Sequence, residues 1–299
     1  SDGHKGRPGA SYPGSSTFGA YGGLTCFLCD SLDRDAIFEA MRRRHHYGTT
    51  GCRMHLGVRV SVPGGGTLFE RNPDAVPDTP NRVVDTAIMG DIVKTSANSV
   101  ELSCEVTAHA GIERIEIRNG ETVLETVRPH ADTELGDRIR VLWSGAEYRG
   151  RGRNTTWRGR AQLSDAKISR FETINHWNPE RFFEQRGSNS VLWDTVTTGN
   201  FMGFDVWLEE SRAGQLNVTT NHGDLSIGLG DVGAADHELD AGGLARKLRV
   251  FRLPDQSLDR SMTVSRTVSL NEVGDTPIWI CVTTEDGYQA WSSPIYLIR

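Results

Sequence analysis

Several features that mark large classes of proteins are missing from this 299-residue sequence. No apolar run approaches the ~18 residues that a membrane-spanning helix needs. The net charge of −6 would not attract a polyanion over long range. Five cysteines, an odd number, do not suggest a disulfide framework. We therefore expect a globular protein that binds neither membranes nor nucleic acid.

The motifs of the commonest hydrolases and nucleotide-binding proteins are missing too. The sequence contains no Gly-x-Ser-x-Gly elbow, no P-loop and no Rossmann glycine fingerprint. The N-terminus also lacks the charged-then-apolar layout of a signal peptide. Any chemistry must therefore depend on other residues.

The most informative stretch lies at the N-terminus, where Asp2 and His4 flank Gly3. A carboxylate and an imidazole are ordinary ligands for Zn, Mn or Fe, and both can face one cation if the backbone bends tightly. Arg7 could hold a phosphate oxygen in a bidentate grip. Two ligands do not complete a metal site, so the alternative is a polar, glycine-rich tail.

Five stretches together resemble the PHP (polymerase and histidinol phosphatase) superfamily, and more narrowly an uncharacterised bacterial branch of it. The resemblance is close over roughly the first fifty residues and loose over the rest. Its stretches are Asp2–His4 with Gly6–Gly9, Phe18–Ala20, Arg34–Arg42, Tyr47–Gly51 and Ala290–Ile295.

The resemblance implies a distorted β/α barrel whose loops hold two or three metal ions for the hydrolysis of a small phosphoester. It makes Asp2 and His4 the last metal ligands and leaves the catalytic residues unassigned. The family's earlier ligands, including a paired-histidine motif, have no counterpart here. We therefore expect a C-terminal fragment that lacks the N-terminal barrel portion, is inactive alone, and binds metal weakly or not at all. The compartment stays open, with the cytoplasm slightly favoured.

Residues 1–51 are expected to form the last strand, loop and helix of that barrel. Asp33 can cap a helix that continues through residues 36–41. The three arginines at 42–44 fall in its last turn and cannot share one face, which favours a solvated helix end over a phosphate site. Cys26 and Cys29 have zinc-knuckle spacing without a second pair, so buried thiols are the favoured interpretation.

Residues 52–299 are expected to form one large antiparallel β-sandwich. Apolar residues alternate from Leu56 to Val62 and again from Val100 to Val106, the period of half-buried strands. A Pro/Gly-rich stretch at about 63–85 predicts a long surface loop. Asn119-Gly120 predicts a hairpin. Further strands are expected at 157–163, 168–174, 204–208, 248–253, 262–270, 278–282 and 288–297, which makes the fold class mainly β.

Three polar stretches in the β region are candidate binding sites, each with a simpler structural explanation. The arginines of residues 149–160 are expected to lie in a solvated loop at a strand edge. Residues 175–178, with Trp177 between amides, could contact a sugar, although a buried tryptophan is commoner in a sandwich. The acidic segments 222–224 and 231–240 lack the calcium-loop pattern and predict surface loops.

Three hypotheses about function follow. The first is the end of a metal-dependent phosphoesterase with its C-terminal β domain. The second is a sandwich that binds a glycan or a partner protein, which predicts solvent-facing aromatics such as Trp177 with Trp193 or Tyr148. The third is a β domain that only covers and stabilises the barrel.

Overall fold

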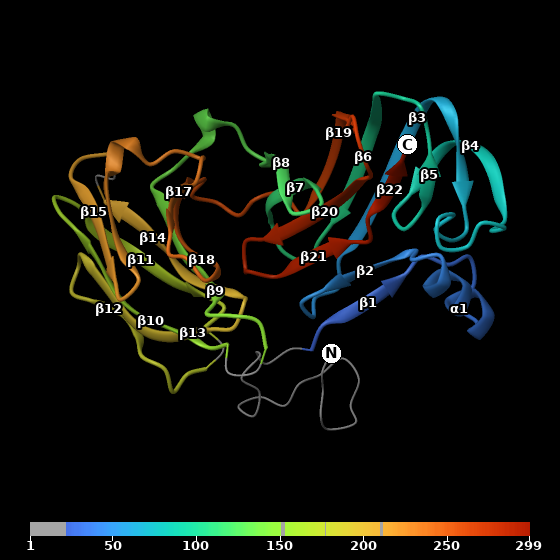
Figure 1. The fold of residues 1–299 in the computed structure, drawn as a ribbon. Helices are drawn as coiled ribbons and strands as arrows, with labels where there is room; N and C mark the ends of the chain where they lie inside the picture. The colour runs from blue at the N-terminus through green and yellow to red at the C-terminus, as the bar shows by residue number, and fades with distance from the viewer. Residues whose placement is uncertain (1–21, 151–152, 177, 210–211) are drawn as a thin grey trace. The chain divides into compact units, whose positions relative to one another are not determined.

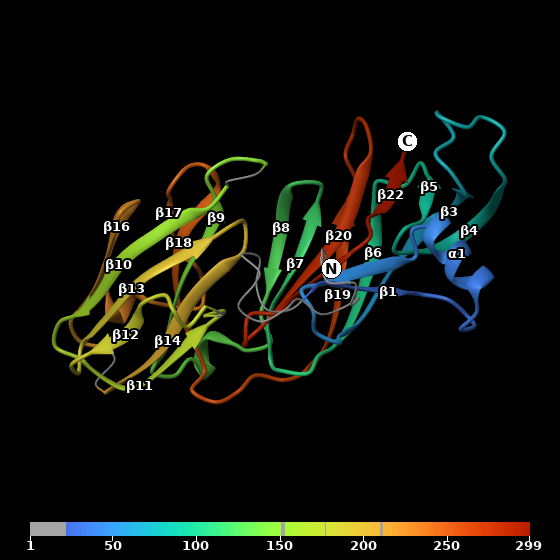
Figure 2. The same cartoon turned by 90° about the horizontal axis from the view of Figure 1, so that it is seen from below.

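The computed structural model describes residues 22–150, 153–176, 178–209 and 212–299, and the protein is mainly β (Figures 1 and 2). The described chain forms two compact units. The first comprises residues 22–129 and 258–299, and the second comprises residues 130–257. Of the helices in the described ranges, none is long and apolar enough to cross a membrane.

The first unit begins with β1 (Leu24–Phe27), α1 (Arg34–Arg42) and β2 (His46–Thr49). Asp33 caps the helix as predicted, because its Oδ1 accepts a hydrogen bond from the Ala36 amide at 2.9 Å. β1 pairs antiparallel with β2, and β2 pairs with β21 (Gln289–Ser292). The expected division at residue 51 therefore does not coincide with a boundary between the units.

A twelve-stranded sheet makes up most of this unit. Its hydrogen-bonded path runs β1-β2-β21-β20-β22-β5-β3-β6-β19, with β4 beside β3 and the β7–β8 hairpin beside β20. The sheet folds back on itself, since side chains from β3 and β6 share one hydrophobic core with those from β7 and β20. The remaining strands of this unit are β3 (His55–Phe69), β4 (Asn81–Ile88), β5 (Ile92–Lys94), β6 (Ser99–Thr107), β7 (Ile112–Asn119), β8 (Thr122–Val127), β19 (Ser261–Ser269), β20 (Thr276–Thr284) and β22 (Ile295–Ile298).

The Pro/Gly-rich stretch differs from the long loop expected at 63–85. β3 continues through Pro63 to Phe69 and pairs with β4, which begins at Asn81. The pairing register shifts between Ser61 and Gly66, because Gly64 and Gly65 have positive φ angles and form an irregularity within the strand. Only the proline-rich part between β3 and β4 is a connecting loop.

The second unit is a β-sandwich of two five-stranded antiparallel sheets, ordered β12-β13-β10-β15-β16 and β11-β14-β9-β18-β17. Inward-facing side chains of both sheets form one core that includes Trp143, Trp157 and Trp193. Its elements are η1 (Asp132–Glu134), β9 (Arg138–Ala146), β10 (Thr155–Leu163), β11 (Lys167–Ile174), β12 (Phe183–Arg186), β13 (Ser190–Thr197), β14 (Phe201–Glu209), β15 (Gln215–Thr220), β16 (Gly223–Gly228), η2 (Leu229–Asp231), β17 (His237–Asp240) and β18 (Leu244–Leu253).

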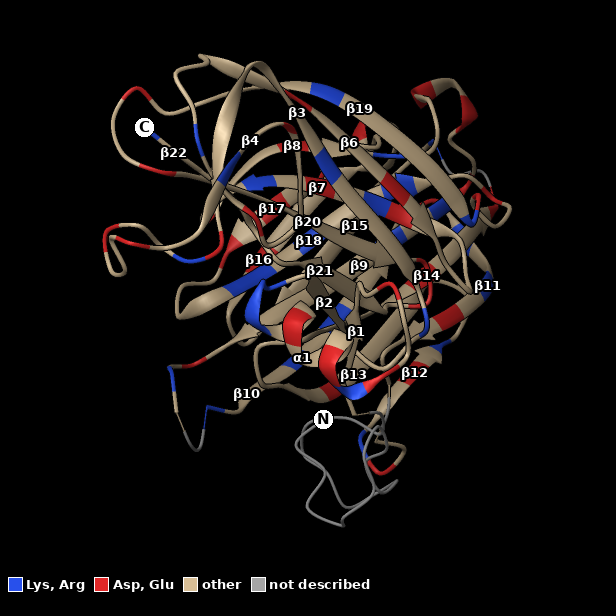
Figure 3. Ribbon diagram, turned by 90° about the vertical axis from the view of Figure 1, so that its right-hand side faces the viewer, with Lys and Arg blue, Asp and Glu red and all other residues tan. Residues whose placement is uncertain are grey.

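The second unit is inserted into the first between β8 and β19. The sequence predicts one large sandwich with long inserted loops, whereas the inserted residues have a hydrophobic core of their own. On the described ribbon, Lys and Arg are interspersed with Asp and Glu along the strands of both units (Figure 3). This mixture is typical of the solvated faces of a protein with a modest net charge.

Candidate functional site

Asp2, His4 and Arg7, the residues that the sequence assigns to metal and substrate, lie outside the described residues. Elsewhere in the chain, the described residues contain no group of three or more His, Cys, Asp or Glu side chains placed to hold a metal ion. The described part therefore adds no metal site to the two ligands predicted from the sequence.

The two later stretches of the resemblance, residues 47–51 and 290–295, are neighbours in the structure. In the β2–β21 ladder, Gly48 lies opposite Trp291, and the flanking residues of both strands pair in register. Ser293 reinforces the junction, since its amide and its hydroxyl both donate to the His46 carbonyl, at 3.2 and 2.7 Å. Strands near the two ends of the sequence thus form one continuous piece of sheet, seen as adjacent blue and red arrows in Figure 1.

One face of this junction is anchored in the core, and the other is accessible. Tyr47 is buried, and its hydroxyl donates to the Met54 carbonyl at 2.5 Å. Burial raises the pKa of the Tyr47 phenol, which therefore stays protonated as a donor. Trp291 keeps 36% of its surface exposed. Gly48, opposite it in the ladder, has no side chain that could cover the indole.

The cysteines differ from the expectation of buried thiols at 26 and 29. Both are exposed, because β1 lies at the end of the sheet path and Cys29 lies two residues beyond that strand. The buried thiols are Cys52, Cys104 and Cys281. Burial raises the pKa of the Cys104 thiol to about 12 and raises that of Cys52 as well.

Thiol labelling is expected to separate these two groups. In the native protein at pH 8, Cys26 and Cys29 should react rapidly with a disulfide reagent, because access and thiolate formation control the rate. The three buried thiols should react only after denaturation. In addition, the raised pKa of Cys52 and of Cys104 disfavours the reactive thiolate form of each. The measurement is the burst amplitude, about two thiols per chain, which Cys26→Ser should halve. Rapid reaction of all five thiols would contradict the burial pattern.

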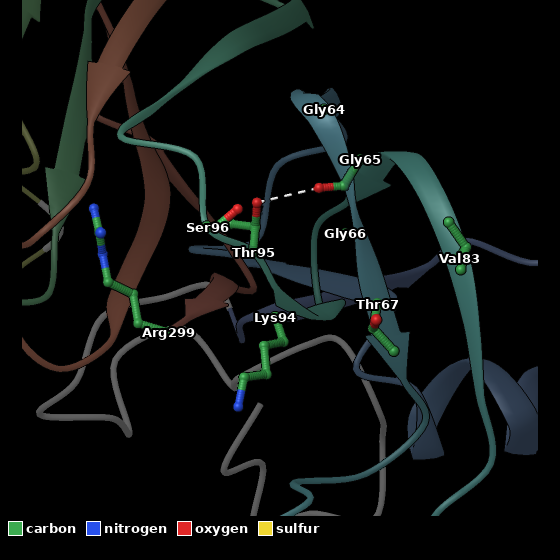
Figure 4. Close-up of a pocket in the computed structure, with 9 residues that line it drawn as sticks. All are labelled: Gly64, Gly65, Gly66, Thr67, Val83, Lys94, Thr95, Ser96 and Arg299. Carbon is green, nitrogen blue, oxygen red and sulfur yellow. Dashed lines mark hydrogen bonds between the residues drawn. The ribbon is translucent and has the colours of Figure 1, made fainter.

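An open hollow of about 650 Å³ lies beside the irregular part of β3 (Figure 4). Its lining includes Gly64–Gly66, three hydroxyl side chains and two cations, Lys94 and Arg299. The Thr95 hydroxyl donates to the Gly65 carbonyl at 3.2 Å and holds one wall. Lys94 and Arg299 point away from one another in Figure 4, so their charges do not converge on one ligand.

The arginines at the end of α1 do not all behave as the solvated helix end that we expected. Arg42 is exposed and packs over the Phe38 ring at 5.8 Å, in agreement with that expectation. Arg43 and Arg44 instead line a pocket of about 180 Å³ together with Arg82 of β4. We expected that three consecutive helical arginines could not share one face. The helix ends at Arg42, however, and Arg44 has a left-handed backbone, so that argument does not apply to Arg44.

Two tryptophans of the second unit lie in its core rather than on its surface. Trp193 is only 2% exposed and stacks on Trp143 with ring centroids 4.5 Å apart. Trp157 is also fully buried, while Tyr148 is exposed. Trp177 lies outside the described residues. The predicted cluster of solvent-facing aromatics that includes Trp193 is therefore wrong.

The polar stretches of this unit take part mainly in its strands and turns. Arg158 of β10, expected in a loop, lies on the solvated side of its sheet and pairs with Asp194 at 3.1 Å. His222, in the turn before β16, packs edge-on against the Trp157 ring, with centroids 4.7 Å apart. Asp236, just before β17, pairs with Arg249 at 3.4 Å. Each of these side chains therefore has a structural contact within the second unit.

The fold thus defines a mainly β protein in which one sandwich is inserted into a larger rolled sheet. Residues 7–117 match the model of a family described as "Protein of unknown function (DUF3604)". The match extends from the N-terminal segment into β7, so it covers α1, the β2 strand and the pocket lined by Arg43, Arg44 and Arg82. No curated protein and no solved structure gives a significant match.

Proposed function

We propose that the chain is the C-terminal part of a metal-dependent phosphoesterase of the PHP type. The observation that carries the proposal is the pairing of β2 with β21. Two stretches that resemble the same superfamily, more than 200 residues apart in the sequence, meet as adjacent strands. If this chain and the superfamily share an ancestor, the two stretches would be retained together because they pair with one another in the sheet.

Asp2 and His4 would supply two ligands to the metal cluster. Their carboxylate oxygen and imidazole nitrogen suit Zn, Mn or Fe. A bound metal of this kind supplies an activated water and offsets the charge of the phosphoryl oxygens. Arg7 would orient the substrate by donating two parallel hydrogen bonds to phosphate oxygens. The remaining ligands would come from a barrel portion that precedes this chain.

The described β units have a supporting role in this proposal. β1 and β2 pair antiparallel in the sheet of the first unit, so these strands are not the barrel end that the sequence predicted. The junction of β2 with β21 would tie the barrel portion to the core of the first unit. On its own, this chain is expected to be inactive, because two ligands hold a metal weakly.

Alanine substitutions in the longer protein test the proposal. Asp2→Ala or His4→Ala should lower the metal content measured by mass spectrometry. Each should also reduce turnover of p-nitrophenyl phosphate or its diester by on the order of 100-fold. Asp30→Ala and His55→Ala are matched controls, since both side chains are exposed and take part in no hydrogen bond that the structure records. Unchanged metal content and turnover in both Asp2→Ala and His4→Ala would overturn the proposal.

A further inference from the structure

A second site of different composition lies beside the end of α1. The pocket of about 180 Å³ between this helix end and strands β3 and β4, called the arginine pocket below, is lined by three guanidinium groups and one imidazole. Two carboxylates also reach it. The charged and titratable residues of its lining are Arg43, Arg44, His45, Glu70, Arg82 and Asp91.

The backbone at Arg44 is bent in a way that places its side chain in the pocket. Arg44 has φ of 63°, the left-handed conformation that glycine or asparagine usually adopts after a helix. Gly90 makes this bend possible, because a Cβ at that position would lie 2.3 Å from the Arg44 carbonyl oxygen. The Arg44 Nε then donates to the Gly90 carbonyl at 2.8 Å. A non-glycine residue held in this conformation is a reason to look for a function.

The two carboxylates are already engaged by neighbours. Asp91 accepts from His45 Nε2 at 2.9 Å through one oxygen and from the Ile88 amide at 2.8 Å through the other. Glu70 accepts from the Arg43 guanidinium at 3.3 Å. Arg43 is held from its other side by Glu39, at 2.6 Å. These pairs neutralise Arg43 but leave two other guanidinium groups in the lining.

Arg44 and Arg82 have no ion-pair partner among the residues that the structure describes. The recorded side-chain hydrogen bonds of Arg44 go to the backbone carbonyls of Arg42, Glu70 and Gly90. Burial lowers the pKa of the Arg44 guanidinium, which nevertheless stays charged at neutral pH. Arg82 is exposed on β4, and its side chain takes part in no recorded hydrogen bond. Three guanidinium charges against two carboxylates leave the lining positive even with His45 neutral.

We propose that the arginine pocket binds a phosphate-type oxyanion, as inorganic phosphate or as the head of a phosphomonoester. A guanidinium fork matches the oxygens of phosphate. The Arg82 side chain has no recorded hydrogen bond, and each terminal nitrogen of Arg44 has a second N–H beyond the one that it donates to a carbonyl. The pocket volume equals the share of roughly six liquid waters, enough for one tetrahedral anion. The site uses none of Asp2, His4 and Arg7, so it stands independently of the proposed phosphoesterase activity.

Calorimetric titration of the full chain with inorganic phosphate, at ionic strength held constant with chloride, tests this site. Phosphate should bind the wild type, and Arg82→Gln should weaken binding about tenfold, the loss expected for one charge-assisted hydrogen bond. Arg82 is the residue to change because its side chain makes no recorded hydrogen bond or ion pair, so its loss should not disturb the fold. Arg260→Gln, an exposed arginine of the same unit with no recorded side-chain contact, should leave affinity within about twofold.

The outcomes distinguish a specific phosphate site from non-specific attraction of anions to surface arginines. They also distinguish free phosphate from a phosphomonoester as the ligand. Phenyl phosphate that competes with phosphate would extend the site to monoesters, and failure to compete would assign it to the free anion. Absence of binding at 20 mM phosphate, or equal losses in Arg82→Gln and Arg260→Gln, would overturn the proposal. No metal or turnover enters the measurement, so its result does not depend on the proposed activity. Circular dichroism of each variant verifies the fold.

Discussion

Gly159→Val is expected to unfold the second unit, and Gly159→Ala to destabilise it by about 1–3 kcal/mol through overpacking. Gly159 of β10 lies opposite Trp193 of β13. A Cβ at Gly159 would lie 2.2 Å from Trp193 Cζ2, where real Cβ contacts do not occur. Trp193 cannot give way, because its other face stacks on Trp143 with only 6° between the ring planes. The missing side chain at residue 159 is therefore part of the core packing.

Urea unfolding followed by tryptophan fluorescence measures this effect, since the stacked indoles report on the second unit directly. Gly233→Ala is a suitable control in the same unit, because no atom lies within 4 Å of a Cβ placed there. Its midpoint should stay near that of the wild type. If Gly159→Ala and Gly233→Ala unfolded at the same urea concentration, the close approach of Trp193 to β10 would be wrong.

Local elements of this fold follow from the sequence with little help from tertiary structure. Alternation of apolar and polar residues predicts a strand at 100–106, and the structure has β6 at Ser99–Thr107. Asn119-Gly120 predicts a hairpin, and Gly120 joins β7 to β8 with a φ of 56°. Asp33 predicts the start of the helix. In each case the decisive interaction lies within a few residues along the chain.

The arrangement of these elements does not follow in the same way. A period of two identifies a strand without naming its partner, and β20 pairs with β7, β21 and β22. The insertion between β8 and β19 is invisible to periodicity, because both units consist of the same kind of strand. The glycines near residue 64 mark an irregularity inside β3 rather than its end, since β4 continues to supply hydrogen-bond partners beyond them.

The arginine pocket shows a similar limit for sites. Arg44 and Arg82 are 38 residues apart and come together only because α1 ends beside the β3–β4 ladder. The helix C-terminus has no glycine at the left-handed position that could have indicated the bend at Arg44. The enabling glycine is Gly90, on another segment. The spacing of arginines in the sequence can suggest a cluster of cations. It does not show which of these arginines have no acidic ion-pair partner in the fold.

Asp205→Ala is expected to destabilise the second unit by about 3–5 kcal/mol, the usual consequence of removing one member of a buried ion pair. The Asp205 carboxylate of β14 accepts from Arg138 Nε at 2.9 Å and from Arg140 Nε at 2.7 Å, and each arginine adds a second bond. The side chains of Asp205 and Arg140 are 3% and 0% exposed. Without the carboxylate, both guanidinium charges lose this partner in a place where water cannot replace it.

Asp194→Ala is a closely matched comparison, because Asp194 of β13 also pairs with two arginines, Arg158 at 3.1 Å and Arg181 at 3.4 Å. Its side chain is 36% exposed, so solvent screens both pairs and the loss should stay within about 1 kcal/mol. Both free energies come from the same urea titration. A loss in Asp205→Ala no larger than in Asp194→Ala would mean that water reaches Arg138 and Arg140. A large difference would identify this charged cluster, together with the stacked tryptophans, as a main determinant of the inserted sandwich.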